Sequence, residues 1–346
     1  MKYTVTPKSA KASIIPVLMA GLCPMMSSSP GVGKSAIATE ICEEFNLVMV
    51  DIRLSTVDPT DLNGFIAPNL ATGRADYLPP SVFPIDGMDK LPEGKDGYLI
   101  FFDEITAAPP AIQAAAYKVI LDRMIGNHKL HPRALMMAAG NGVKDNAVAS
   151  RMSTALQSRM VHFELVVSAK EWIEHAIEKK FDPRVIAYAE HRPDVLSSFD
   201  PKHTDKTFCC PRTMEFLSKI LAKVPASTPA HDYSLMPMYA GTVGDGIGTE
   251  FRAFLEIYKE LIKFETISNN PKRAPIPEEP SALFALSGVI GERTDKDNIL
   301  AVMQYVERLP IEHQVSTIKK IGANKPELKT STAFINWLDV NAKKLF

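Results

Sequence analysis

Short apolar runs alternate with helix-like periodic segments between residues 24 and 165. Short apolar runs are typical of buried strands, whereas hydrophobic residues at every third or fourth position indicate one face of a helix. The predicted strands cover residues 24–27, 47–52, 98–102, 134–139 and 160–165, and the predicted helices cover 34–45 and 109–123. This alternation predicts an α/β fold in which a parallel sheet is sandwiched by helices.

The chain beyond residue 166 carries helical patterns and few strand signals. Ser168 followed by Glu171 predicts a capped helix start, and Asp182 before a proline predicts another. Helical periodicity covers residues 212–222 and 250–264, a proline-rich connector covers 269–280, and three further helical patterns follow. We therefore expect an α/β domain over residues 1–165, an all-helical unit over 166–268 and a C-terminal helical extension over 269–346.

Composition narrows the class of protein. The chain has 346 residues, 46% of them hydrophobic and 23% charged, which is typical of a soluble globular protein with two or three packed units. A formal net charge of -1 provides no overall basic field for nucleic acid, although a local basic stripe stays open. The apolar segment 12–26 is short and contains Pro16 and Pro24, which argues against a membrane span. Four cysteines without a CxxC pair predict reduced thiols, and we expect a cytoplasmic protein.

A glycine-containing loop lies between the first predicted strand and the first predicted helix. Gly31 and Gly33 permit a left-handed backbone that turns N–H groups toward phosphate oxygens, and the helix start adds its positive end. We expect Lys34 to reach the β- and γ-phosphates and the hydroxyl of Ser35 to bind Mg²⁺, so the loop predicts binding of ATP or ADP. The residues expected to hold the nucleotide are Ser28, Ser29, Pro30, Gly31, Val32, Gly33, Lys34, Ser35 and Ala36.

Ser28 stands where a phosphate-binding loop of this kind usually has its first glycine. A serine could adopt the required backbone at some strain, or the loop could lie slightly differently. A chance glycine loop is the alternative interpretation. The remaining residues of the motif, in a strand–loop–helix setting, favour a phosphate-binding loop.

Two acidic residues end the predicted strand at residues 98–102. Asp103 would hold the metal ion through its water shell, and Glu104 would orient or deprotonate the attacking water. Asn141, at the end of another predicted strand, could hydrogen-bond both water and the γ-phosphate. A solvated strand end would explain the acid pair alone, but the loop upstream favours a site that binds and hydrolyses ATP with Mg²⁺.

With these residues in place, the chain resembles the MoxR-like group of AAA+ ATPases from about residue 14 to at least residue 254. The resemblance extends beyond the phosphate loop and the acidic strand end. The further matching segments are residues 50–54 with 58–64, 137–141, 155–160, 210–213 and 243–245 followed by Glu250 and Phe251. The resemblance implies an AAA+ nucleotide-binding domain followed by a helical lid.

The resemblance assigns roles to Asn141 and to three arginines. Asn141 corresponds to the sensor 1 asparagine. Arg159 lies in a segment similar to the one that carries the arginine finger, and it is the first choice for that role, with Arg151 in the same region as its rival. Arg212 resembles the sensor 2 arginine that opens a lid helix and couples the lid to the nucleotide. An ordinary surface or interdomain ion pair is the alternative for each arginine.

The resemblance also implies two inserted hairpins and a ring. The irregular stretch 64–84 could hold one insert, and residues 125–130 read as a hairpin with a Gly-Asn turn. In the family such loops face a pore or a partner, while a purely structural hairpin is an equal alternative. The resemblance implies a homo-oligomeric ring, a hexamer, that converts ATP to ADP and phosphate. It would remodel or mature a partner complex, such as one with a von Willebrand factor A domain.

Two other functions stay open. A DNA-directed motor or loader would need pore loops rich in lysine and arginine, but the loop after Asp58 is acidic, and Lys129 with Arg133 gives only a thin basic signal. A nucleotide-gated scaffold with little turnover is supported by Ser28 in place of glycine. The scaffold is opposed by the intact set of Lys34, Asp103, Glu104 and Asn141.

Overall fold

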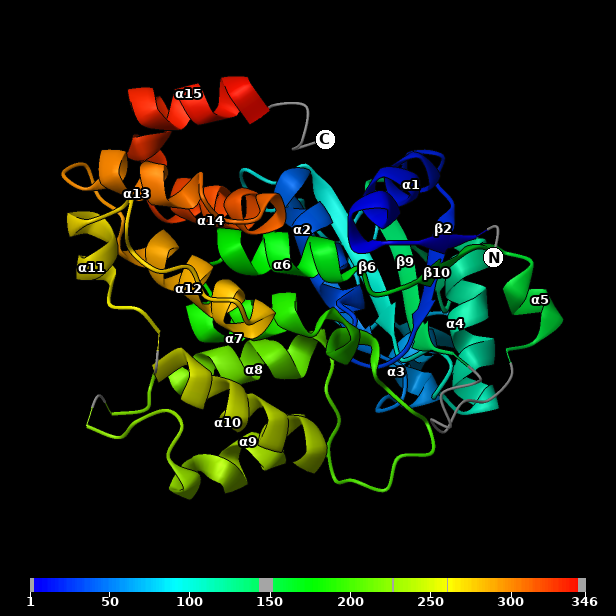
Figure 1. Ribbon diagram of the computed structural model, residues 1–346. Coiled ribbons are helices and arrows are strands. Elements are labelled where there is room, and N and C mark those ends of the chain that lie inside the picture. The colour runs from blue at the N-terminus through cyan, green and yellow to red at the C-terminus, as the bar shows by residue number, and fades with distance from the viewer. Residues whose placement is uncertain (1–2, 143–151, 226, 260, 342–346) are drawn as a thin grey trace. The chain divides into compact units, whose positions relative to one another are not determined.

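The computed structural model describes residues 3–142, 152–225, 227–259 and 261–341, and Figure 1 traces its helices and strands. The chain divides into two compact units. The first comprises Met1–Val167 with Asp200–Lys202, and the second comprises Ser168–Phe199 with His203–Phe346. Each unit is described by itself, and the three-part division expected from the sequence stays a prediction.

The first unit is built on a six-stranded sheet in which every pairing is parallel. The strands, in their order across the sheet, are β1 (Thr4–Val5), β10 (Met160–Leu165), β2 (Cys23–Ser28), β9 (Ala134–Asn141), β6 (Gly97–Asp103) and β3 (Leu47–Arg53). The five strands predicted from apolar runs and the parallel sheet are confirmed. The edge strand β1 was not predicted, because two residues are too short to produce a periodic signal.

Helices cover both faces of this sheet, as predicted. One layer contains α1 (Pro7–Met19) and α2 (Lys34–Glu44), and the other contains α3 (Pro59–Asn63) and α4 (Pro110–Asp122), while the short α5 (Thr154–Gln157) precedes β10 (Figure 1). Alternate residues of β6 serve the two layers, because side chains along a strand point to opposite faces. Leu99 and Phe101 pack in the cluster of α1 and α2, whereas Ile100 and Phe102 pack in the cluster of α4.

The sequence suggested that the stretch 64–84 is irregular, but part of it forms regular strands. It contains an antiparallel two-stranded sheet formed by β4 (Phe65–Asn69) and β5 (Arg74–Leu78). Asn69 shapes the turn, because its Oδ1 accepts hydrogen bonds from the backbone N–H groups of Ala71 and Thr72, at 3.0 and 3.2 Å. No residue of either strand is buried, so the sequence lacks the alternation that normally marks a strand.

The hairpin predicted at residues 125–130 is confirmed. It consists of β7 (Met124–Ile125) and β8 (His128–Lys129). Gly126 in its turn has a φ of 57°, and a side chain there would also collide with Tyr77 and the carbonyl of Asn63. Glycine is therefore required both by the backbone conformation and by the close approach of β5.

The second unit is all-helical in its described residues, as predicted. Its predicted helix starts are confirmed, since Ser168 accepts a hydrogen bond from the Glu171 N–H at 3.3 Å and Asp182 accepts one from the Arg184 N–H at 2.9 Å. The α-helices are α6 (Ala169–Glu178), α7 (Pro183–His191), α8 (Pro211–Leu221), α9 (Met236–Val243), α10 (Asp245–Lys259), α11 (Phe264–Asn269), α12 (Pro280–Arg293), α13 (Ile299–Val306), α14 (Ile311–Asn324) and α15 (Thr332–Asn341).

Two predicted helical regions differ in the structure. The helix expected over residues 250–264 begins earlier, at Asp245, and Phe264 belongs instead to α11. The start was not predicted because Gly246 and Gly248 interrupt the helical pattern of hydrophobic residues and glycine is a poor helix former. Gly248 is needed there because a side chain would lie within 3 Å of the backbone of α9. After the connector, the described residues form four α-helices, α12 to α15, rather than three.

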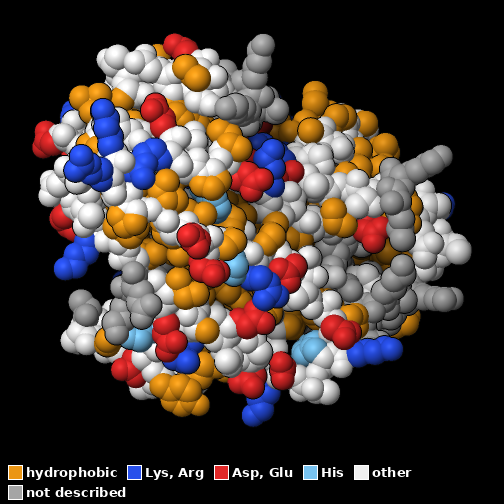
Figure 2. Space-filling view, in the orientation of Figure 1, with side chains coloured by type: hydrophobic (Ala, Val, Ile, Leu, Met, Phe, Trp, Pro, Cys, Tyr) orange, Lys and Arg blue, Asp and Glu red, His pale blue; other side chains and the backbone are white. Residues whose placement is uncertain are grey.

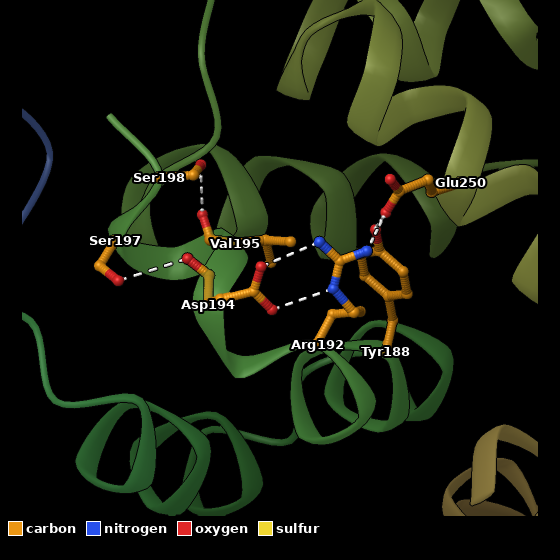
Figure 3. A network of polar contacts seen from close by, with 7 residues as sticks. All are labelled: Tyr188, Arg192, Asp194, Val195, Ser197, Ser198 and Glu250. Carbon is orange, nitrogen blue, oxygen red and sulfur yellow. Dashed lines mark hydrogen bonds and ion pairs between the residues drawn. The ribbon is translucent and has the colours of Figure 1, made fainter. Parts of the chain in front are cut away.

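A polar network joins three segments of the second unit (Figure 3). The Arg192 guanidinium donates two hydrogen bonds to the Asp194 carboxylate, both at 2.9 Å, and it also pairs with Glu250 of α10. The Tyr188 hydroxyl donates to the same Glu250 at 3.3 Å. The hydrogen bonds from Arg192, and then its charge, lower the pKa of Asp194 below its usual value. These groups are partly exposed, so the network fixes the geometry of α7 and α10 more than it stabilises them.

A buried ion pair joins α7 and α14 in the same unit. Lys320 Nζ lies 2.6 Å from a Glu190 carboxylate oxygen, and their side chains are only 4% and 8% exposed. Ser316 Oγ donates to the other oxygen of Glu190 at 2.7 Å. The pair is satisfied as it stands, but loss of either partner would leave an uncompensated charge in a buried setting.

We predict that Lys320→Met lowers the free energy of unfolding by about 3–5 kcal/mol, because the Glu190 carboxylate is left buried without a cation. Adding Glu190→Leu should restore most of this loss. Lys319→Met is the control, since Lys319 pairs with Glu174 at a more exposed position and should cost less than about 1 kcal/mol. Urea unfolding measures all four proteins, and a Lys320→Met variant as stable as the control would contradict the prediction.

The described residues include no helix that is both long enough and apolar enough to span a membrane. The four cysteines are free thiols and all are buried, which agrees with the reduced state expected from the sequence. Burial raises the pKa of the Cys23 thiol to about 12, so this side chain behaves as an unreactive core residue.

Candidate nucleotide-binding site

The register of the parallel sheet brings the polar strand ends together. Ser28 at the end of β2 pairs with Asn141 at the end of β9, and Asp103 at the end of β6 pairs with Arg53 at the end of β3. Parallel strands finish at the same edge of a sheet, which we call the carboxyl edge. The carboxyl edge of an open α/β sheet is the usual place for a ligand.

The loop after β2 has the backbone that an anion site needs. Gly31 and Gly33 have φ angles of 78° and 110°, in the region that favours glycine. A side chain at Gly33 would meet no atom within 4 Å, so glycine is needed there for its backbone conformation rather than for space. Gly33 is the N-cap of α2 and makes no side-chain cap hydrogen bond, and the positive N-terminal end of a helix attracts anions.

Ser28 carries no backbone strain. Among the described residues, those with positive φ other than glycine are Asn46, Glu104, Arg123 and Lys180. Ser28 is the last residue of β2, and its side chain is 5% exposed. Of the two alternatives considered for this position, strain at the serine and a slightly different loop, the backbone of Ser28 does not show the first.

Lys34, the first residue of α2, points its ammonium group back toward the strand ends. Its Nζ donates to Ser28 Oγ at 2.9 Å, to the Asn141 side-chain oxygen at 3.0 Å and to the Ser28 carbonyl at 3.2 Å. The lysine is thus linked to two neighbouring strands. Its position is that expected of a cation for phosphate oxygens at this edge.

The remaining residues predicted for the loop lie around this centre. Ser29 and Pro30 are half-buried between the strand and the glycines. Val32 is buried against α1 and α2 and anchors the loop to the core, whereas Ala36 is exposed on α2. The nine predicted residues thus cover the end of β2, the turn after it and the first residues of α2, at the carboxyl edge.

Two oxygen groups suited to a hard cation lie beside the loop. Ser35 Oγ donates to Asp103 Oδ2 at 3.3 Å, and Asp103 Oδ1 accepts from the Glu104 backbone N–H at 2.8 Å. In the described residues there is no cluster of three or more His, Cys, Asp or Glu side chains that could enclose a metal ion. Ser35 and Asp103 therefore fit Mg²⁺, which typically keeps several waters and shares phosphate oxygens with one or two protein groups.

Glu104 has a φ of 57°, a conformation that costs energy for a residue with a side chain. Its carboxylate accepts a short hydrogen bond from the hydroxyl of Ser55, in the turn after β3. Nearby, burial and then the negative charge of Asp103 raise the pKa of Asp51, although its side chain keeps some contact with solvent. The sequence did not point to Ser55, because its contact with Glu104 depends on the pairing of β3 with β6.

Asn141 is held by a residue that sequence reasoning also missed. Its backbone N–H donates to Thr106 Oγ1 at 2.9 Å, and Thr106 is only 5% exposed. A side chain at Gly140 would lie 2.6 Å from the same Oγ1, so glycine is required next to Asn141. Thr106 and Gly140 therefore help to fix the backbone position of Asn141 at the carboxyl edge.

Arg159 does not join this centre within one chain. The pairing of Met160 with Cys23 places Arg159 at the opposite edge of the sheet, where strands begin. The six residues of β2 separate the two edges by roughly 16 Å. Arg159 is exposed, its Nη1 donates to Ser158 Oγ at 2.6 Å, and its guanidinium lies 5.4 Å from the centre of the Tyr117 ring.

The other two arginines stay predictions. Arg151 lies outside the described residues. Arg212 is the second residue of α8 and is exposed. Arg212 belongs to the second unit, and its role toward the nucleotide stays a prediction.

The sheet and its carboxyl edge define the class of fold. A phosphate-type loop follows β2, an acid pair follows β6, and an asparagine ends β9 between them in the sheet. With helices on both faces of the sheet and an all-helical unit after it, this is the α/β fold with a sandwiched parallel sheet that the sequence predicted.

Comparisons with known proteins do not identify a family for this chain. No family model matches the chain, and no curated protein matches it. Among solved structures it is similar to a protein from Cytophaga hutchinsonii described as a candidate ATPase, with 13% identity, coverage of 100% of this chain and 91% of the other, and a TM-score of 0.37. It is also similar to a point variant of RuvB from Thermotoga maritima, with 14% identity, coverage of 97% and 88%, and a TM-score of 0.35.

We predict that Thr106→Val lowers the free energy of unfolding by about 1–3 kcal/mol, because the Asn141 N–H loses its acceptor in a largely buried position. Thr106→Ser keeps the hydroxyl and should lose much less. Urea unfolding followed by circular dichroism compares the two variants with the unmodified protein. Equal stability of Thr106→Val and Thr106→Ser would show that the hydrogen bond does not matter.

Proposed function

We propose that the chain binds ATP with Mg²⁺ and hydrolyses it to ADP and phosphate. The observation that carries this proposal is the convergence of Lys34, Ser35, Asp103, Glu104 and Asn141 at one edge of the sheet, beside a loop with the backbone of a phosphate site. Each of these groups matches one need of phosphoryl transfer. A chance arrangement would not be expected to supply all of them.

The residues of the chain divide the work of the reaction. The N–H groups of the loop and of the α2 start bind phosphate oxygens, and Lys34 balances negative charge on the β- and γ-phosphates. Mg²⁺, held by Ser35 and Asp103, would neutralise charge that develops on the phosphate oxygens. Asn141 offers its amide N–H groups to the γ-phosphate or to water, because its side-chain oxygen accepts from Lys34.

Glu104 acts on the attacking water. The water oxygen forms a bond to the γ-phosphorus, the bond to the bridging oxygen of ADP breaks, and ADP leaves with the electron pair. Glu104 orients the water and accepts its proton. Ser55 fixes the rotamer of Glu104, whose backbone is already held by Asp103.

Glu104→Gln should therefore lower ATP turnover by at least about 100-fold while ATP binding is retained, because the amide keeps the shape of the side chain but accepts no proton. Turnover is measured as phosphate release, and binding by titration with a fluorescent ATP analogue. A Glu104→Gln variant that hydrolyses ATP at the normal rate would remove Glu104 from the mechanism. An unmodified protein that binds ATP without turnover at any concentration would favour the scaffold alternative.

We further propose that the active form is a homo-oligomeric ring, a hexamer, in which Arg159 completes the site of a neighbouring subunit. Arg159 is exposed at the edge of the sheet opposite to its own phosphate loop, so it cannot serve that loop. A head-to-tail interface would bring one edge of a sheet toward the other edge of its neighbour's sheet. An arginine supplied in this way stabilises the charge of the transferring phosphoryl group.

This arrangement can be tested by mixing two inactive variants. Arg159→Ala and Glu104→Gln should each lose turnover, and an equimolar mixture should recover it, because about a quarter of the interfaces in a randomly mixed ring combine an intact Glu104 with an intact Arg159. Arg151→Ala mixed with Glu104→Gln is the matched comparison that decides between the two arginines. A mixture of Arg159→Ala and Glu104→Gln without recovery would exclude Arg159 as a residue acting between subunits.

The partner is proposed to be a protein that the ring remodels or matures, such as one with a von Willebrand factor A domain. The hairpin β4–β5 supports a protein partner, because Phe65, Ile66 and Leu78 are exposed on it and Leu70 is exposed in its turn. A DNA-directed function is less supported, since the hairpin has one arginine and the face in Figure 2 intersperses charges of both signs. Free buried cysteines support a cytoplasmic location.

A further inference from the structure

We propose that Ser28 is a positioning residue that holds Lys34 in the nucleotide-free state and competes with the nucleotide for its ammonium group. This inference rests on the proposed nucleotide site and adds a regulatory contact within it. A glycine at the same position would leave the backbone of the loop unchanged, but it could not make this contact.

The hydroxyl of Ser28 is oriented to accept a hydrogen bond from Lys34. Ser28 Oγ donates its own proton to the carbonyl of Ser29 at 2.8 Å, so its lone pairs remain for Lys34 Nζ at 2.9 Å. A hydroxyl that donates on one side becomes a stronger acceptor on the other. The burial of the Ser28 side chain protects this hydrogen bond from exchange with water.

Four acceptors surround the Lys34 ammonium group, which has three hydrogens. They are Ser28 Oγ, the Ser28 carbonyl and the Asn141 side-chain oxygen, all within 3.2 Å of Nζ, and the Ser29 carbonyl at 3.4 Å. A phosphate oxygen that binds Lys34 must displace at least one of them. The hydroxyl is the acceptor that this chain adds to the motif, since a backbone carbonyl is present whatever residue stands at position 28.

The competition should depend on the phosphates that Lys34 reaches. Ser28→Ala removes the hydroxyl with little change in volume, so ADP should bind about threefold to tenfold more tightly. AMP lacks the β-phosphate, and its affinity should not change. A purely structural role for Ser28 would alter both affinities in the same direction.

The test is titration of the purified full-length protein with ADP and with AMP, in the presence of Mg²⁺. Ser27→Ala is the matched control, because Ser27 lies on the same strand and its hydroxyl donates to the carbonyl of Phe163 on β10 instead. Ser28→Thr keeps the hydroxyl and should bind ADP like the unmodified protein. In a Lys34→Ala background Ser28→Ala should have no further effect, which a double-mutant cycle measures.

The outcomes separate this inference from the proposed function. Tighter ADP binding by Ser28→Ala, lost in the Lys34→Ala background, supports the inference. If ADP binding depends on Lys34 but Ser28→Ala leaves it unchanged or weaker, the inference alone is overturned. If the unmodified protein binds no ADP, the nucleotide site and this inference both fail. Should Ser28→Ala not fold, Ser28→Gly provides the same test.

Discussion

The common carboxyl edge of β2, β9, β6 and β3 is the constraint on which the rest of the first unit depends. Parallel pairing fixes which residues end next to one another, so Ser28 meets Asn141 while Asp103 meets Arg53. A shift of one residue in this register would turn each side chain to the other face of the sheet. The phosphate loop, the acid pair and the asparagine therefore form one centre only because the apolar strands beneath them hold this register.

The inner strands β2, β9 and β6 could be predicted from the sequence because they are largely buried on both faces. Every residue of β6 before Asp103 is buried, so the strand is a continuous apolar run that ends abruptly in acids. The glycines of the loop were equally readable, because left-handed backbone demands them. A single sequence therefore shows buried strands, as apolar runs, and residues that a local backbone conformation requires, such as the loop glycines.

Contacts between distant residues left no such signal. Ser55 and Thr106 are ordinary hydroxyl residues until the sheet places them against Glu104 and Asn141. The resemblance suggested an insert at residues 64–84, but the sequence pattern did not show the strands β4 and β5, since neither face of this hairpin packs on a core and no alternation is required. The start of α10 was missed because glycine is a poor helix former, and Gly248 is required there by the close approach of α9.

The backbone at Ser28 reduces the support for the alternative of a nucleotide-gated scaffold with little turnover. That alternative drew its support from the idea that a side chain there would strain the loop and weaken the site. The left-handed backbone lies instead at Gly31 and Gly33, which adopt it without strain, and at Glu104, while Ser28 continues β2 in regular pairing with Asn141. The departure from the motif therefore leaves the backbone of the phosphate site intact. Its physical consequence is confined to the hydroxyl, which gives Lys34 an additional acceptor.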